Sequence, residues 1–257
     1  MHPYFTIFGI QVSAYALMAM VGLLVAGFIF TRRISEELPE DKDSTFLLFV
    51  IAFGMYAGGH VLFFITRAKH WHLLFEAESF EKFKEVLTSL AGGSVFYGGL
   101  IGAFLLGVLY LKIRRLPGAV YMDSAALFAP VFHGFARIGC FFSGCCYGIE
   151  SSFGLTYGGT VRFPVQLLES LCNFIIAAVI FAVLKKGLLR GRVFYLYLAI
   201  YAFVRFFDEF LRGDEIRGFI FGLSTSQFIS IFIEAFALIM LFLPFIKNKI
   251  KKEATSE

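Results

Sequence analysis

Long apolar segments alternate with shorter polar connections along this chain. Seven of the segments approach or exceed the roughly 20 residues that a helix needs to cross about 30 Å of hydrocarbon. The third segment is short, and the fourth and sixth carry charged residues. The pattern predicts an all-α fold, a polytopic membrane helix bundle of about seven transmembrane helices with an outward-facing small head region. The expected spans cover residues 7–30, 44–66, 95–112, 119–141, 165–184, 193–211 and 225–246.

The second connection is longer than the others and has a different pattern. It contains the amphipathic stretch "WHLLFEAESFEKFKEVLTSL", which begins at Trp71. Stretches of this kind lie in the membrane interface, so residues 67–94 are predicted to form an interfacial helix on the outer surface. Residues 247–257 form a basic tail. Because the chain shows neither a low-complexity segment nor a convincing internal repeat, residues 1–257 are predicted to form a single integral membrane domain.

Basic residues are concentrated in alternate connections. The positive-inside rule places such connections in the cytoplasm, which puts the N-terminus outside and the C-terminus inside. Residues 67–94 also carry four basic residues and weaken this contrast. The N-terminal sequence "MHPYFTIFGI" has neither a basic region nor a cleavage site, so the first apolar segment is expected to be retained. The basic groups are Arg32, Arg33 and Lys42; Lys112, Arg114 and Arg115; Lys185, Lys186, Arg190 and Arg192; and Lys247, Lys249, Lys251 and Lys252.

Composition supports the membrane assignment. The chain is 58% hydrophobic and only 16% charged, whereas soluble domains carry roughly 25% charged residues. A soluble globular class is therefore excluded. The four cysteines are too few for a disulfide framework.

Several ionisable residues nevertheless fall inside the expected spans. Each costs roughly 2.5–3.5 kcal/mol to insert at bilayer depth, so such residues are usually paired or functional. Most lie toward the predicted outer ends of their spans, which suggests one polar cavity that opens outward or sideways. They are His60, Asp123, His133, Arg137, Glu169, Arg205, Asp208, Glu209 and Arg212.

Helical spacing predicts how some of these residues pair. Arg205 and Glu209 are four residues apart, and so are Asp208 and Arg212, so both ion pairs can form on neighbouring faces. A purely structural network at a helix end is the alternative to a functional site. His133 lies four residues before Arg137, and the two are expected to face a shared anionic partner. Alternatively, the Arg137 side chain snorkels to the interface.

Paired glycines follow a tyrosine in the third span. Glycine in a membrane helix allows close approach of another helix or of a ligand. Helix packing alone explains Gly102 and Gly107. It is a weaker explanation for Tyr97, Gly98 and Gly99, because a phenol at depth needs a hydrogen-bonding partner.

Six motifs follow one another in order along nearly the whole chain. The most distinctive is "RIGCFFSGCCYG", residues 137–148 and here called the signature segment. Together the six resemble motifs of the prolipoprotein diacylglyceryl transferases, and the signature segment is similar to the family form R-x-G-N-F-x-N-G-E-x-x-G. "VSAYALM" resembles W-Y-G-L-M and aligns Tyr15 with the family tyrosine. The remaining stretches are "FYGGLIG", "FPVQLLES", "YAFVRFFDEFLRGD" and "LSTSQFIS". They resemble F-H-G-G-L-I-G, H-P-S-Q-L-Y-E, Y-G-x-x-R-F-x-x-E-F-x-R-x-x-D and M-G-Q-x-L-S.

The chain departs from the family pattern at polar positions. Cys140, Ser143 and Cys145 stand where the family has Asn, Asn and Glu, and Tyr97 replaces a His. Phe163 and Ala14 likewise replace a His and a Trp, and an arginine of the second span is absent near Gly59 or His60. The resemblance therefore transfers the fold and the lipid chemistry more strongly than the identity of the acceptor.

The resemblance implies a transferase of the bacterial cytoplasmic membrane. Such enzymes move the diacylglyceryl group of phosphatidylglycerol onto a lipoprotein cysteine thiol, and glycerol phosphate leaves. It implies a phospholipid substrate, a lipobox-containing preprolipoprotein as partner, no nucleic acid, and neither a metal nor another cofactor. The implied catalytic residues are Arg137, Arg205, Glu209 and Tyr97. The implied substrate-binding residues are Tyr15, Gly98, Gly99, His133, Cys140, Ser143, Gly144, Cys145, Gly148 and Arg212.

The cysteines of the signature segment admit several readings. They can be small packing residues, or Cys145 or Cys146 can be an activated thiol that carries an intermediate. Metal binding is a third reading, although Cys140-x4-Cys145-Cys146 lacks ordinary zinc spacing and a clear fourth ligand. A disulfide from Cys140 to Cys145 or Cys146 is a fourth interpretation. Cys172, inside the fifth span, is expected to be a packing residue.

Two other functions stay open beside the transferase. One is a related phospholipid-dependent transferase or lipid-remodelling enzyme with another acceptor. The other is a transporter, against which stand the lack of a repeat and of paired broken helices.

Overall fold

The helices of the computed structural model follow the predicted apolar segments. The structure describes residues 3–7, 9–214 and 218–254. The long helices are α1 (Ala14–Glu37), α2 (Ser44–Thr66), α5 (Phe96–Ile113), α6 (Gly118–Ser143), α7 (Val165–Lys185), α8 (Val193–Asp208) and α9 (Thr225–Ala254). The predicted basic tail lies partly in the last turns of α9, and its residues 255–257 fall outside the described chain.

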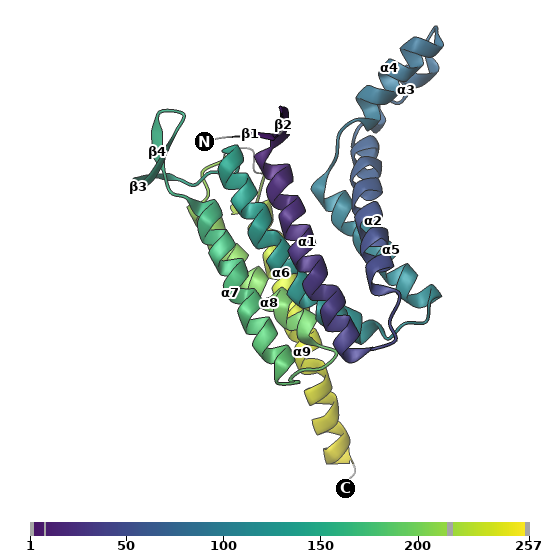
Figure 1. The fold of residues 1–257 in the computed structure, drawn as a ribbon, viewed down its shortest axis with the longest axis vertical. Helices are drawn as coiled ribbons and strands as arrows, with labels where there is room; N and C mark the ends of the chain where they lie inside the picture. The colour runs from purple at the N-terminus through teal and green to yellow at the C-terminus, as the bar shows by residue number, and fades with distance from the viewer. Residues whose placement is uncertain (1–2, 8, 215–217, 255–257) are drawn as a thin grey trace. The chain divides into compact units, whose positions relative to one another are not determined.

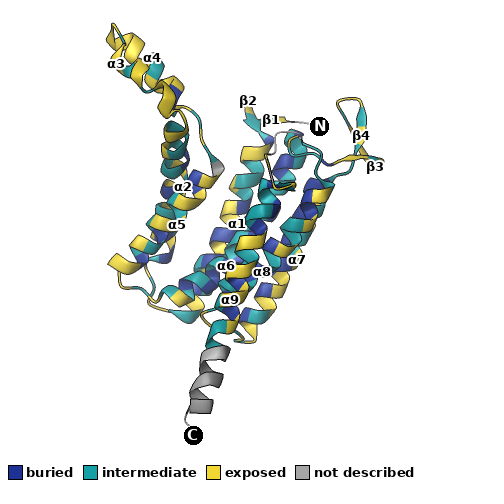
Figure 2. Ribbon diagram, turned by 180° about the vertical axis from the view of Figure 1, so that it is seen from behind, coloured by how far each residue is buried: buried dark blue, intermediate teal, exposed yellow. Residues whose placement is uncertain are grey.

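Among the described residues, length and hydropathy mark five helices as candidate membrane spans. These are α1, α2, α6, α7 and residues 225–244 of α9. The helices α5 and α8 are apolar but shorter, and α8 has only 16 residues before the 3-10 turn η2 (Glu209–Leu211). Exposed residues are frequent on the outward sides of the helices (Figure 2). They include many large apolar side chains, such as Phe28 and Phe53, as expected for a protein that spans a membrane several times.

Three small hairpins in the described part of the chain depart from the all-α prediction. The first joins β1 (Tyr4–Ile7) to β2 (Ile10–Ser13), so α1 begins at Ala14 and not near residue 7. The second joins β3 (Glu150–Tyr157) to β4 (Thr160–Arg162), and the third joins β5 (Phe219–Ile220) to β6 (Leu223–Ser224). Two-residue hairpin turns favour residues with positive φ. Gly158 and Gly159 supply these angles at 57° and 85°, and Phe221 and Gly222 at 52° and 80°.

The connection predicted as one interfacial helix is broken into short pieces. It contains the 3-10 turn η1 (Ala68–His70), α3 (His72–Phe75) and α4 (Phe80–Ala91). The Ser79 hydroxyl accepts a hydrogen bond from the Lys82 amide at 3.2 Å and starts α4 afresh. Serine is a preferred N-cap because its side-chain oxygen satisfies a free amide of the first turn, so the helix restarts there.

The chain divides into two compact units. The larger comprises Met1–Glu37 and Ala119–Glu257, and the smaller comprises Leu38–Gly118. In the smaller unit α2 packs along α5 through facing glycines. A Cβ atom built on Gly54 would lie 2.6 Å from the Gly102 carbonyl oxygen, and one on Gly102 would lie 2.9 Å from the Gly58 Cα atom. The two backbones are therefore in direct contact.

Asp43 fastens the start of α2 to the end of α5. Its carboxylate accepts hydrogen bonds from the Arg114 Nε at 2.9 Å and from the Tyr110 hydroxyl at 2.5 Å. These two bonds hold the pKa of Asp43 below its ordinary value.

Replacing Gly102 with alanine is expected to destabilise the smaller unit by roughly 1–3 kcal/mol, the usual range for overpacking. The new methyl group would meet backbone atoms of Gly54 and Gly58, which cannot rotate away. The measurement is thermal unfolding of the purified protein in detergent. Gly107→Ala is the matched control, because its methyl group would meet only the Ile51 side chain, at 3.3 Å. Equal unfolding midpoints for the two variants would contradict the assigned helix contact.

The larger unit contains α1 and α6 to α9 (Figure 1). A buried apolar core joins α1, α6, α7 and α8 and includes Ala26, Leu127, Ile180 and Tyr197. The hairpins β1–β2 and β3–β4 lie at one end of this unit, together with the end of α6, and the C-terminal turns of α9 lie at the other (Figure 1). The signature segment therefore begins inside the helix bundle and leaves it at the hairpin end.

Candidate functional site

Three arginines converge on one buried glutamate in the larger unit. Glu169 on α7 is 2% exposed. Its carboxylate forms an ion pair with the Nε atom of Arg137 on α6, and its Oε1 lies 3.8 Å from Nη1 of Arg205 and 3.8 Å from Nη1 of Arg212. We call Arg137, Arg205 and Arg212 the arginine cluster. It assembles three positive charges from α6, α8 and the segment after α8.

Further acidic and polar groups fix two of these arginines. The Arg205 Nη2 atom lies 2.6 Å from Glu209 Oε2, which confirms the predicted pair, and it donates to the Ser226 hydroxyl at 3.1 Å. Arg212 donates to both carboxylate oxygens of Asp214, at 3.1 and 2.7 Å. The predicted pairing of Asp208 with Arg212 is wrong. The α-helix ends at Asp208, and Arg212 adopts an extended backbone with φ −87° and ψ 140°.

The arginine cluster is buried. The side chains of Arg137, Arg205 and Arg212 are 11%, 12% and 8% exposed, so Arg137 does not snorkel to the surface. Arg205 Nη1 has no hydrogen-bond acceptor among the described side chains. Burial alone would lower the pKa of Arg212, but its bond to Asp214 and the charge of Glu169 outweigh burial and raise the pKa. The guanidinium groups of the arginine cluster thus lie in a region of low dielectric. Charged donors in such a region bind an anion more strongly than in water.

The cysteines of the signature segment fold back on one another. After α6 ends at Ser143, Gly144 and Cys146 adopt positive φ angles of 70° and 56°. The Sγ atoms of Cys140, Cys145 and Cys146, here called the thiol cluster, lie within 4.8 Å of one another. All are free thiols; Cys140 is buried, Cys146 is half-buried and Cys145 is exposed. Arg137 Nη1 lies 3.9 Å from the Cys140 sulfur, so the thiol cluster adjoins the arginine cluster.

Backbone contacts lock the two clusters together. Gly148 forms an isolated antiparallel bridge with Arg212. The Ile149 amide donates to the Leu211 carbonyl at 3.0 Å, and the Gly213 amide donates to the Tyr147 carbonyl at 3.0 Å. A Cβ atom on Gly148 would lie 3.0 Å from the Leu211 carbonyl oxygen, so only glycine fits without a shift.

The remaining predicted residues of this unit surround the clusters. A Cβ atom on Gly139 would lie 3.1 Å from the Tyr15 Cα atom, which brings the start of α1 against the signature segment. His133 packs on the ring of Tyr201, with centroids 5.5 Å apart. The Ser143 hydroxyl is buried and has no hydrogen-bond partner among the described residues.

Tyr97, Gly98 and Gly99 belong to the smaller unit. A Cβ atom on Gly99 would lie 2.9 Å from the Met55 carbonyl oxygen, and one on Gly98 would come still closer to the Gly58 carbonyl oxygen. Both glycines therefore serve the contact of α5 with α2. The Tyr97 side chain is 45% exposed.

Two residues of the site were not among the predicted site residues. The sequence marks Glu169 only as a charge inside a span, although it stands in the stretch "FPVQLLES". Gln166, in the same stretch, is 2% exposed and donates to the Cys145 carbonyl at 2.7 Å. The sequence signal for both residues is the match of this stretch to the family form H-P-S-Q-L-Y-E, in which Gln166 and Glu169 stand at the Q and the E.

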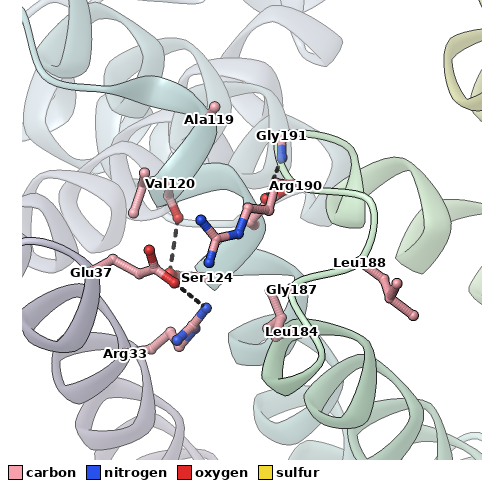
Figure 3. Close-up of a pocket in the computed structure, with 11 residues that line it drawn as sticks. Arg33, Glu37, Ala119, Val120, Ser124, Leu184, Gly187, Leu188, Arg190 and Gly191 are labelled. Carbon is pink, nitrogen blue, oxygen red and sulfur yellow. Dashed lines mark hydrogen bonds and ion pairs between the residues drawn. The ribbon is translucent and has the colours of Figure 1, made fainter. Parts of the chain in front are cut away.

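Asp123 corrects the prediction of a single polar cavity. It lines a separate pocket of about 290 Å³ in the larger unit. Figure 3 shows this pocket with Arg33, Glu37 and Arg190 among its labelled residues. The Asp123 carboxylate accepts from the amides of Gly191 and Val193 at 2.6 and 3.0 Å and so holds the connection before α8. Arg33 pairs with Glu37 at 2.6 Å in the same pocket. The polar groups of this pocket are largely satisfied by one another, which makes it a weaker candidate site.

Known proteins are similar to the chain over most of its length. Residues 3–243 match the family model described as prolipoprotein diacylglyceryl transferase. A phosphatidylglycerol–prolipoprotein diacylglyceryl transferase of Clostridium tetani is 32% identical over 238 residues, which cover 89% of this chain and 91% of that protein. The protein named phosphatidylglycerol–prolipoprotein diacylglyceryl transferase 2 of Clostridium perfringens is 32% identical, with 88% and 89% covered. A relative of the same description in Clostridium novyi is 27% identical, with 95% and 96% covered.

Proposed function

The chain belongs to the prolipoprotein diacylglyceryl transferase family, and on this premise we propose that the arginine cluster is where phosphatidylglycerol gives up its diacylglyceryl group. The protein is a membrane transferase that acts on phosphatidylglycerol and a prolipoprotein. The observation that carries the site assignment is the convergence of Arg137, Arg205 and Arg212 on the buried Glu169.

The reaction needs positive charge mainly at the phosphate oxygen of the leaving group. The sulfur of the acceptor cysteine forms a bond to a glycerol carbon, and the bond from that carbon to the phosphate oxygen breaks. The electron pair leaves with the oxygen, so glycerol phosphate departs as an anion, and the thiol loses its proton. Guanidinium groups hold a phosphate through parallel hydrogen bonds. Donors fixed before the reaction stabilise the developing charge most effectively.

Each member of the site receives a role on this basis. Arg137 and Arg205 bind the departing phosphate, and Arg212 contributes charge from the hairpin side. Glu169 holds the three guanidinium groups in position before the lipid arrives. Glu209 orients Arg205, a role that its 2.6 Å contact supports. In the larger unit, the residues that line the approach of the two substrates are Tyr15, His133, Cys140, Ser143, Gly144, Cys145 and Gly148. Tyr97, Gly98 and Gly99 lie on α5 of the smaller unit and stay predictions from the sequence.

A reconstituted assay tests this function. The purified protein in phosphatidylglycerol-containing nanodiscs is incubated with a lipobox peptide, and the diacylglyceryl thioether and glycerol phosphate are measured by mass spectrometry. Both products should appear in equal amounts, and a peptide with serine in place of its cysteine should give neither. Consumption of lipid without peptide modification would contradict the proposal that a lipoprotein cysteine is the acceptor. Absence of lipid turnover would contradict the proposed transferase reaction itself.

Arg205→Lys is expected to lower the transfer rate by about tenfold or more while the protein still inserts. One guanidinium contacts Glu209, Ser226 and Glu169 together, whereas a lysine ammonium lacks the planar fork. The measurement is the initial rate of thioether formation at matched membrane levels. A fully active Arg205→Lys protein would refute phosphate recognition by a guanidinium at this position.

We propose seven membrane crossings, with α5 and α8 as the two shorter ones. The connections rich in Lys and Arg face the cytoplasm, as does the C-terminus, and the N-terminus faces outward. Exposed Phe75 and Phe80 support a position of residues 67–94 at the outer membrane surface. The thiol and arginine clusters then open toward the outer leaflet.

A cysteine placed near Arg114 is expected to resist an impermeant thiol reagent in intact cells. The host protein carries serine at its four native cysteine positions, so only the new thiol can react. The reagent should label this cysteine after the cells are opened. Labelling in intact cells would reverse the proposed topology.

A further inference from the structure

The thiol cluster has the composition of a metal site. Three sulfur atoms lie within 4.8 Å of one another, although their spacing in the sequence is not that of an ordinary zinc motif. The left-handed backbone of Gly144 and Cys146 reverses the chain and returns two thiols to the last turn of α6. A non-glycine residue seldom adopts positive φ, so the fold maintains this convergence against a local preference. Packing alone does not require three thiols to point at one another.

The distances suit a tetrahedral ion. Zn–S bonds of about 2.3 Å place the sulfur atoms of a tetrahedral site about 3.8 Å apart. Small side-chain rotations of Cys145, which is exposed, and of Cys146, which is half-buried, would close the remaining difference. Thiolates select soft or borderline ions over Mg²⁺ and Ca²⁺, which prefer oxygen ligands.

The surrounding charge also suits such a site. Three thiolates and one Zn²⁺ ion carry a net charge of −1. Arg137 lies 3.9 Å from the Cys140 sulfur, and Arg212 is bridged to Gly148 just beyond the cluster. The Gln166 side chain holds the Cys145 carbonyl at 2.7 Å and fixes the loop that presents the thiols. Contacts of this kind around the ligands orient a metal site and tune its affinity.

We infer that Cys140, Cys145 and Cys146 bind a Zn²⁺ ion whose fourth coordination position receives the thiol of the acceptor cysteine. Three protein ligands with one open position are the arrangement of catalytic zinc sites, whereas structural zinc sites are closed. This inference rests on the proposed function and names how the acceptor is activated. The exposed side of Cys145 supplies the access that an incoming peptide needs.

The metal would carry out a step that the arginine cluster cannot. A thiol that coordinates a metal ion is deprotonated, so the acceptor releases its proton to solvent when it binds Zn²⁺. The metal-bound sulfur then forms the bond to the glycerol carbon as the bond to the phosphate oxygen breaks. Electrons balance without an oxidant, because the sulfur supplies the pair for the new bond and the phosphate oxygen keeps the pair of the old one. The thioether product is a weaker ligand than a thiolate and can leave.

Metal analysis of the full chain tests the site itself. The reduced protein is purified in detergent, titrated with Zn²⁺ and measured by elemental mass spectrometry. One tightly bound ion per chain is expected in the unchanged protein and in Cys172→Ser, the matched control that removes the cysteine outside the cluster. Changes outside the ligand shell alone lower metal affinity about 10–100-fold, so Cys145→Ser should lower it by at least about tenfold. Because Cys145 is exposed, this variant is expected to fold normally, which its thermal unfolding midpoint checks.

Cobalt substitution tests the open position. The Co²⁺-loaded protein should show thiolate-to-cobalt charge-transfer absorption, and addition of the lipobox peptide should increase it, whereas the peptide with serine at its cysteine should not. Absence of Zn²⁺ from the reduced protein, or equal Zn²⁺ in Cys145→Ser, would overturn the metal site even if the protein transfers diacylglyceryl groups. If the cobalt spectrum did not change on addition of the lipobox peptide, the proposal that the metal ion binds and activates the acceptor thiol would be wrong. A zinc-loaded protein that responds to the thiol but forms no thioether would instead overturn the proposed function.

Discussion

Replacement of Arg137 with alanine is expected to lower the rate of thioether formation at least about a hundredfold. Loss of one fixed donor to a developing anion costs on the order of 3 kcal/mol, and each 1.4 kcal/mol is about a factor of ten in rate. Arg137 contacts Glu169 on one side and lies beside the Cys140 thiol on the other. In the proposed site, its removal therefore takes charge away from the point where the leaving phosphate and the attacking sulfur would meet.

The measurement compares initial rates in nanodiscs after the membrane level of each variant has been matched by immunoblot. Arg190→Ala is the control, because this exposed arginine lines the separate pocket that contains Asp123. It should retain nearly full activity. Near-normal activity in Arg137→Ala would remove the basis of the site assignment.

Glu169→Gln is expected to destabilise the larger unit by about 3–5 kcal/mol, the range observed when one partner of a buried ion pair is removed. The change keeps the shape of the side chain but removes the negative charge on which three arginines converge. Arg137, Arg205 and Arg212 would then repel one another in a largely buried region. The measurement is denaturant or thermal unfolding in detergent, followed by circular dichroism and by loss of the monodisperse peak in size-exclusion chromatography.

Glu234→Gln is the matched control for this change. Glu234 lies on α9, and its Oε2 atom is buried without a hydrogen-bond partner among the described residues. Neutralising it should leave stability unchanged or raise it, because no paired charge is lost and a desolvated one is removed. If Glu169→Gln behaved like Glu234→Gln, the arginine cluster would be held by something other than Glu169.

The helices could be predicted from the sequence because each is a local pattern. About twenty apolar residues in a row have few alternatives to a membrane helix, and α2 has the predicted bounds of residues 44 and 66. The hairpins were missed because they depend on a few turn residues. Gly158 and Gly159, for example, only reveal their role once β3 and β4 pair.

The candidate site divides in the same way. The Arg205–Glu209 pair follows from helical spacing within α8 and η2. The meeting of Arg137 with Glu169 depends on how α6 packs against α7, which no spacing reveals. The thiol cluster depends on the left-handed Cys146, a conformation that sequence rules assign to glycine and asparagine far more readily.

The position of Arg137 and Glu169 on consecutive helices also bears on biogenesis. If α6 entered the lipid alone, it would bring an unpaired arginine with it, at roughly 2.5–3.5 kcal/mol on insertion scales. A hairpin of α6 and α7 carries the opposite charges together, and their ion pair offsets much of that energy. The two helices are thus expected to leave the translocon as a pair, after α7 has been synthesised. The order in which this protein's helices partition into the bilayer then follows their charge partners and not hydropathy alone.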